Sequence, residues 1–293
     1  IGLWCVTAWQ QMGKPQSFKL IELGPGRGTL MADALRAAAQ ISDFCEAASV
    51  HLVEMSPTLQ STQKETLSKH ANKLHWHDQL EDVPAGPSIL VGNEFLDALP
   101  VRQFQVSGGK WFERCVGIGE DGMLEFCLAT SPIDDDGIIP AAIRNKAQEE
   151  DFAEIRPAQE DIVKALASRA AENPLVALFI DYGHTASAPG ETLQALSQHD
   201  CADPLAEPGD SAKRLGLLLH GLMTQSLFLI SLGLQERCER LIRDADNQAR
   251  ADIISGAERL ADPAQMGDLF KVMALSSHGL SLPPFEPPDS GKF

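Results

Sequence analysis

The sequence predicts an α/β protein built on an open, mostly parallel β-sheet with helices on both faces. Apolar runs of strand length occupy residues 18–23, 50–54, 88–92 and 175–181. Most of these runs lack the alternation of polar and apolar residues that a half-exposed strand has. Segments with helical spacing lie between the first of them. This strand–helix–strand order is typical of a parallel sheet, because each crossover helix packs on one face of it.

Local signals place the elements of the first hundred residues. Gly13 ends a helix that begins near Ile1, and Pro57, directly after Ser56, lies in the first turn of another helix. A glycine-rich turn separates the first strand from the next helix. We therefore expect helices at residues 1–12 and 28–39 and from Ser56 onward, and strands at residues 18–23, 50–54, 73–76 and 88–92.

The middle of the chain changes character after residue 100. Segments 102–106, 110–118 and 124–128 are β-like and are separated by Ser-Gly-Gly and Glu-Asp-Gly turns, which predicts an antiparallel insertion. After it we expect a helix at 157–172, a strand at 175–181, helices at 224–232, 235–245 and 253–261, and a last strand at 270–275. The chain then divides into residues 1–100, 101–174 and 175–293 within a single structural unit.

Charge and cysteine use narrow the class of protein. The formal net charge is −17, which disfavours a nucleic acid as partner and suits a basic protein segment better. The six cysteines include no pair at metal-ligand spacing, so we expect no metal site and a reducing compartment. The sequence has no apolar run of membrane-spanning length. Because the chain opens at Ile1, within an apolar helical pattern, we expect the natural protein to begin earlier.

The most informative motif follows the first predicted strand. Gly24, Gly26 and Gly28 form a GxGxG turn, with Glu22 two residues before the first glycine. Glycines permit a tight turn and a close approach of ligand to backbone, at the sheet edge where α/β proteins bind nucleotide-like ligands. Dinucleotide folds use GxGxxG instead. S-adenosylmethionine has no phosphate but carries an ammonium group that an acid such as Glu22 can meet, so we expect this cofactor.

Two further acids lie at the ends of the next strands. Glu54 follows the second strand and can accept hydrogen bonds from both ribose hydroxyls, although enzymes that use NAD have the same feature. Asp78 follows the third strand and could reach the adenine amino group, with Trp76 or His77 beside the ring. These acids support an adenosine ligand without selecting one.

Four segments together resemble the MidA-like family of S-adenosylmethionine-dependent methyltransferases. They are residues 22–36 (ELGPGRGTLMADALR), 93–104 (NEFLDALPVRQF), 181–184 (DYGH) and 262–277 (DPAQMGDLFKVMALSS). The resemblance implies a Rossmann-like fold of the class I methyltransferase type and S-adenosylmethionine as cofactor. Its mitochondrial member is an arginine methyltransferase that assists assembly of respiratory complex I. Two departures from the family pattern are a missing N-terminal segment with a Gly/Asp-rich loop and a shorter stretch at residues 204–220.

An arginine substrate gives the acids after the fourth strand a role. A guanidinium has a pKa above 12, so carboxylates must hold it and accept a proton. Glu94 and Asp97 are three residues apart, and both point into one pocket if a helical turn begins there. We expect them to clamp the guanidinium, with Glu94 as proton acceptor. The alternative is structural, with Asp97 at a helix N-terminus and Glu94 as a hydrogen-bond acceptor.

Other residues near these acids are candidates for the substrate pocket. Asn93 precedes Glu94, and Tyr182 and His184 lie in the DYGH segment, where they line the pocket or form a structural turn. The resemblance implies a protein substrate, with a respiratory complex I subunit as one candidate. Cysteine use and the lack of a membrane-spanning run lead us to expect the cytoplasm of a bacterium, or the mitochondrial matrix if the protein is eukaryotic. The apolar helices near the C-terminus could form a homodimer interface.

Two other functions remain open on the sequence alone. One is a non-catalytic assembly protein that retains the fold. The presence of Glu22 and Glu54 argues against it, because such a protein has no need of cofactor-binding acids. The other is a nicotinamide-dependent enzyme, which the GxGxG spacing disfavours.

Overall fold

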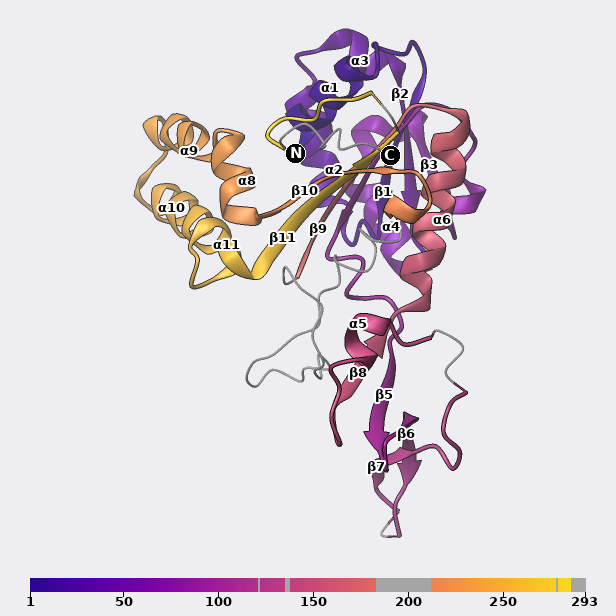
Figure 1. The fold of residues 1–293 in the computed structure, drawn as a ribbon. Helices are drawn as coiled ribbons and strands as arrows, with labels where there is room; N and C mark the ends of the chain where they lie inside the picture. The colour runs from indigo at the N-terminus through magenta and orange to yellow at the C-terminus, as the bar shows by residue number, and fades with distance from the viewer. Residues whose placement is uncertain (121, 135–137, 183–211, 278, 286–293) are drawn as a thin grey trace.

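The computed structural model describes residues 1–120, 122–134, 138–182, 212–277 and 279–285, and it contains a large and a small β-sheet (Figure 1). The large sheet has seven strands. In their order across the sheet they are β10 (Leu218–Thr224), β11 (Phe270–Ser276), β9 (Leu175–Tyr182), β4 (Ser88–Asn93), β1 (Phe18–Leu23), β2 (Ala48–Val53) and β3 (Leu74–His77).

The order of these strands creates a switch point beside β1. Strands β3, β2, β1, β4 and β9 are parallel, and β11 pairs antiparallel with β9 and β10. The chain runs from β1 outward to β2 and β3 and then returns to β4 on the other side of β1. Ligands of open α/β sheets bind at the carboxyl ends of the strands at such a point. The prediction of a mostly parallel sheet is confirmed.

Helices cover both faces of the large sheet. The helices of the first hundred residues are α1 (Gly2–Gln11), α2 (Thr29–Ala38), α3 (Ser42–Ala47), α4 (Pro57–Thr66), η1 (Ser68–Lys73) and η2 (Leu80–Asp82). Alternate residues of β1 face opposite cores. Leu20 packs in the core that includes Trp4 of α1 and Met31 of α2, whereas Ile21 packs in the core that includes Leu166 of α6 (Pro157–Glu172).

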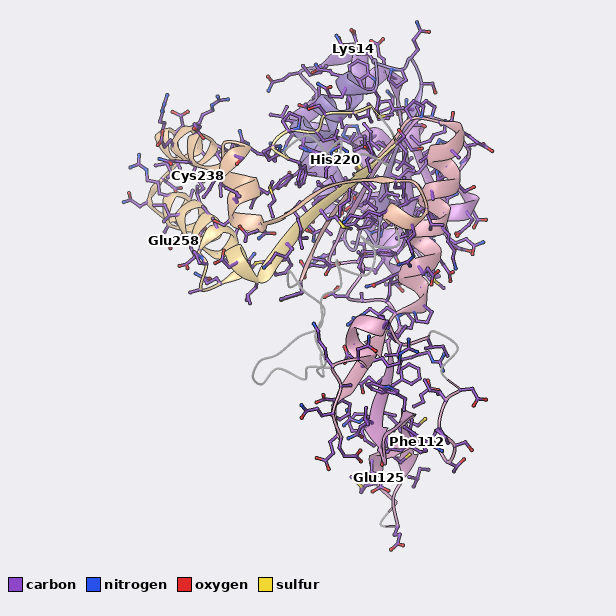
Figure 2. All side chains as sticks on the ribbon, in the orientation of Figure 1. Lys14, Phe112, Glu125, His220, Cys238 and Glu258 are labelled. Atoms are coloured by element: carbon purple, nitrogen blue, oxygen red, sulfur yellow. The ribbon has the colours of Figure 1, made fainter. Side chains whose placement is uncertain are left out.

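The predicted antiparallel insertion is the small sheet. Its strands lie in the order β7 (Leu124–Leu128), β6 (Lys110–Ile118), β5 (Arg102–Ser107) and β8 (Phe152–Ile155), and the short helix α5 (Ala141–Arg144) packs beside them. Figure 1 shows this sheet projecting from the large one, and Figure 2 marks Phe112 and Glu125 on it. It has a core of its own around Phe104 and Trp111. Helix α6 follows it in sequence but packs on the large sheet.

The last helices form a lobe at the β10 edge of the large sheet (Figure 1). They are α8 (Gln225–Ser231), α9 (Leu234–Arg243), α10 (Asn247–Ala261) and α11 (Met266–Leu269). Neither α9 nor α10, marked by Cys238 and Glu258 in Figure 2, contains a buried residue. Leu227, Ile230 and Ile254 are exposed on this lobe, and a homodimer through it stays a prediction.

None of the helices in the described part of the chain is long and apolar enough to cross a membrane.

Candidate active site

The glycine turn after β1 has the backbone conformation that its composition predicts. Gly24, Gly26 and Gly28 have φ angles of 58°, 53° and 78°, which L side chains rarely adopt. The Gly24 N–H donates to the carbonyl of Val53 at 3.1 Å, and this bond ties the turn to β2. A Cβ on Gly24 would lie 2.9 Å from Phe95, whereas a Cβ on Gly26 would meet no atom within 4 Å among the described residues, its two chain neighbours aside. The turn is therefore open to a ligand at Gly26.

Glu22 is a buried acid beside this turn. Its side chain is 3% exposed, and its Oε2 atom has no hydrogen-bond partner among the residues that the structure describes. Burial raises the pKa of Glu22 to about 8, against a smaller opposing effect from a hydrogen bond with the Met31 backbone. A buried oxygen without a partner is satisfied by a donor or a cation. The ammonium group of S-adenosylmethionine fits this requirement.

The Glu54 carboxylate is oriented by its neighbours at the end of β2. Its Oε1 accepts the Ser56 N–H at 2.9 Å and its Oε2 accepts the Gln63 amide at 3.2 Å. Gln63 is fully buried, and its amide also donates to the Gly26 carbonyl at 2.8 Å while its oxygen accepts the Trp76 indole N–H at 2.9 Å. Gln63 thus joins the glycine turn, the proposed ribose-binding acid and Trp76. No sequence pattern marks Gln63 as a site residue, because it is one of several polar residues in a polar helix.

Asp78 and His77 lie at the end of β3. Asp78 is exposed, and the described residues give it no hydrogen bond or ion pair. The His77 Nε2 is 2.8 Å from Nδ1 of the buried His51, and the two rings stack with centroids 5.1 Å apart. Asp78 is therefore free to meet a ligand, while His77 is occupied by a second histidine.

The segment after β4, which we name the acceptor loop (residues 94–99), is not helical. Glu94 has a φ of 50° and is exposed, its N–H donates to the Ile180 carbonyl at 2.9 Å, and its carboxylate accepts the Asn93 amide at 3.3 Å. A single turn closes from the Leu99 N–H to the Leu96 carbonyl. The helical turn on which the shared orientation of Glu94 and Asp97 was conditional does not begin at Glu94, because its N–H extends the β4–β9 ladder and its φ is left-handed.

Asp181 at the end of β9 binds this loop. Its Oδ2 accepts the N–H groups of Leu96 at 2.8 Å and Asp97 at 3.4 Å, and its Oδ1 accepts the Tyr182 N–H at 3.0 Å. The side chain is fully buried. Burial, and then the charge of Asp97, raise the pKa of Asp181 to about 7, against the three N–H donors. The DYGH segment led us to predict Tyr182 and His184 as site residues, but not Asp181.

Tyr182 forms an aromatic wall next to these acids. Its side chain is 46% exposed, and its ring lies 4.2 Å from that of Phe270 at β11. Burial, followed by the charges of Glu94, Asp97 and Asp181, raises the pKa of Tyr182. The charges of these three acids therefore all act on the Tyr182 phenol. His184, predicted for the same pocket, lies outside the described residues.

The geometry brings the predicted residues to one edge of the sheet. The glycine turn with Glu22 ends β1, Glu54 ends β2, the acceptor loop ends β4 and Tyr182 ends β9. Acids beside an aromatic ring suit a cationic substrate group. Within the described ranges, no group of three His, Cys, Asp or Glu residues has the arrangement of a metal site.

Comparisons with known proteins identify the family of the chain. Residues 1–211 match a family model described as "Putative S-adenosyl-L-methionine-dependent methyltransferase". The chain is 34% identical to the protein arginine methyltransferase NDUFAF7 homolog, mitochondrial, of Drosophila melanogaster, over 94% of this chain and 71% of that protein. It is 31% identical to human NDUFAF7, over 95% of this chain and 70% of that protein.

Two solved structures from Burkholderia thailandensis have the same fold. One has a TM-score of 0.74 and 25% identity over 99% of this chain and 81% of that chain. The other was solved with S-adenosyl-homocysteine bound and has a TM-score of 0.73 and 24% identity, over 95% of this chain and 76% of that chain. The chain therefore belongs to the family of S-adenosyl-L-methionine-dependent methyltransferases that includes NDUFAF7, and it is an enzyme of this kind with S-adenosylmethionine as its cofactor.

Proposed function

We propose that this enzyme methylates an arginine side chain of a protein substrate. The observation that carries the proposal is the group of acids at the carboxyl ends of β4 and β9, where the buried Asp181 binds the loop that carries Glu94 and Asp97 and also accepts the Tyr182 N–H. A planar cation bounded by carboxylates and an aromatic face is the environment that a guanidinium prefers. The relatives named protein arginine methyltransferase support the same substrate.

The residues at the glycine turn and at the ends of β2 and β3 bind S-adenosylmethionine and orient it. Glu22 meets the ammonium group, the backbone at Gly26 lies against the ligand, Glu54 accepts from the ribose hydroxyls and Asp78 from the adenine amino group. Bound S-adenosylmethionine supplies an electrophilic methyl group on a positively charged sulfur. Gln63 fixes Glu54, so the carboxylate is in place before the ligand arrives. Such preorganisation removes part of the entropic barrier of a two-substrate reaction.

The acceptor loop prepares the nucleophile. Glu94 and Asp97 accept hydrogen bonds from the guanidinium and keep its charge on the nitrogens far from the transferred methyl group. Glu94, which is exposed, receives the proton that the reacting nitrogen loses and passes it to solvent. Asn93 orients Glu94, because its amide donates to the Glu94 carboxylate at 3.3 Å. Tyr182 and His184 line the pocket.

The protein substrate and its location follow from the relatives. The curated relatives are mitochondrial, and the name NDUFAF7 links them to respiratory complex I. We infer a complex I subunit as substrate, in the mitochondrial matrix of a eukaryote or the cytoplasm of a bacterium. A net charge of −17 favours a basic segment of that subunit over an acidic one.

The test replaces the proposed proton acceptor without changing its size. Glu94→Gln should reduce methyl transfer by about 100-fold, the lower end of general acid–base effects, because an amide cannot accept the proton. S-adenosylhomocysteine at about 100 times its Kd should still stabilise the variant by roughly 2.7 kcal/mol. Transfer is measured with labelled cofactor, and stabilisation by thermal unfolding.

The matched control is Glu125→Gln on the small sheet, where the same change is made at an exposed position (Figure 2). It should leave both readouts unchanged. Full transfer activity in Glu94→Gln contradicts the role of Glu94, whereas loss of the ligand-induced stabilisation would place Glu94 in the cofactor site instead.

A further inference from the structure

Two buried side chains from other elements hold both backbone polar groups of one residue of the acceptor loop. Asp181 from β9 accepts the Leu96 N–H at 2.8 Å, and Gln159 from α6 donates to the Leu96 carbonyl at 3.2 Å. Their side chains are 0% and 2% exposed. We propose that Asp181 and Gln159 are positioning residues for methyl transfer, which fix the backbone N–H and carbonyl of Leu96 and thereby position the Asp97 carboxylate for the substrate. This inference rests on the proposed function.

The loop needs such partners because it has no regular structure. A buried peptide group that bonds neither to a helix nor to a strand requires side-chain partners. Leu96 is 1% exposed and packs in the core beneath α6, so its peptide cannot use water instead. Asp181 and Gln159, which we name the loop clamps, therefore determine where the next residue, Asp97, is placed.

A carboxylate at position 181 satisfies a demand that a neutral side chain cannot. Three N–H groups point at it, and only a carboxylate offers two acceptor oxygens. Lys271 lies opposite Asp181 in the β9–β11 register, but its ammonium donates to the Asp268 carbonyl. Lys271 therefore does not neutralise Asp181. The nearby charge of Asp97 makes the ionised form of the buried Asp181 still less favourable. The three N–H groups of the loop and of Tyr182 explain why position 181 holds an aspartate despite this cost.

The first variant is Asp181→Asn, which keeps the size of the side chain and replaces one acceptor oxygen with a donor. We expect hydrogen exchange at the Leu96 and Asp97 amides to accelerate by about tenfold, because the neutral amide oxygen accepts their hydrogen bonds more weakly than a carboxylate oxygen does. The kcat for methyl transfer should fall by at least about tenfold, while the KM for S-adenosylmethionine stays within about twofold, because a displaced acceptor costs rate rather than cofactor binding.

The second variant, Gln159→Leu, removes the other clamp and should change the same readouts in the same direction. It decides the matter if Asp181→Asn does not fold. The matched control is Ser277→Ala. Ser277 accepts the Leu175 N–H at 3.1 Å at the opposite end of β9, so its loss should leave exchange in the acceptor loop unchanged.

The exchange measurement needs no methyl acceptor, so it separates this inference from the proposed function. Unchanged loop exchange in both clamp variants would overturn the inference even if arginine is the substrate. Faster exchange with an unchanged kcat would also overturn it, because the clamps would then be structural only. Absence of arginine methylation by the wild-type enzyme, with faster exchange in the variants, would contradict the proposed function but keep the clamps.

Discussion

Burial keeps the carboxyl group of Glu22 protonated near neutral pH. Its pKa is raised from 4.5 to about 8, so the folded protein binds a proton that the unfolded chain releases at pH 7. This contribution to stability is present below pH 4.5 and is lost as pH rises through 8. A ligand ammonium placed against its partnerless oxygen stabilises the ionised form and lowers this pKa.

We therefore predict that S-adenosylhomocysteine displaces a proton from Glu22 when it binds at pH 7. Calorimetry in two buffers with different ionisation enthalpies measures this proton. Wild-type protein should release up to about one proton per ligand, since a carboxyl with a raised pKa is mostly protonated in the free site. Glu22→Gln should release none and bind more weakly. Equal proton release by the two proteins would show that Glu22 does not meet the ammonium group.

Single residues also mark the limit of sequence reasoning. Glu22, Glu54 and the three glycines could be selected because their spacing follows a strand, and they do lie at one sheet edge. Gln63 and Asp181 could not be assigned roles. Their partners are backbone groups or side chains up to 85 positions away, and only the folded chain brings these together.

At the scale of elements, two glycines of the glycine turn have different roles: Gly24 packs against a side chain, and Gly26 faces space that a ligand could occupy. A Cβ on Gly24 meets the Phe95 ring at 2.9 Å, whereas a Cβ on Gly26 meets no atom of the described protein within 4 Å. Both glycines have left-handed φ angles. Alanine at either position therefore carries backbone strain, but only the Gly26 substitution fills space that a ligand would use.

We predict that Gly26→Ala reduces unfolding free energy by about 1–2 kcal/mol, the cost of a left-handed L-residue, and weakens S-adenosylhomocysteine binding by more than that. Gly24→Ala should reduce stability further because of Phe95. Urea unfolding and ligand titration measure the two effects. A Gly26→Ala protein that binds the ligand as tightly as the wild type would place the cofactor elsewhere.

Elements with a periodic apolar signal were predicted closely, and weak or interrupted ones were not. Helix α6 and strands β1 and β6 have the expected bounds. Strand β10 was missed because Gly221 sits in a register shift, which interrupts the pattern of the strand. Helix α10 begins at Asn247 rather than 253, because its first turns are polar and its start is set by the Asp246 cap.

At the scale of the whole molecule, two architectural parts meet at the site. The large sheet supplies the glycine turn and Asp181, helix α6 supplies Gln159, and the acceptor loop leads into β5 of the projecting small sheet (Figure 1). The sequence predicted both sheets, because apolar runs and alternating hairpins have different patterns. The domain limits at residues 100 and 174 stay a prediction.

The central claim is that this edge of the sheet transfers a methyl group to arginine in a protein. The most direct measurement uses S-adenosylmethionine with a deuterated methyl group and solubilised respiratory membranes that contain complex I, followed by hydrolysis and mass spectrometry of the amino acids. We predict label in methylarginine with the wild-type enzyme, and about 100-fold less with Glu94→Gln. Label in another amino acid, or no protein-bound label from an enzyme that binds S-adenosylhomocysteine, would contradict the claim.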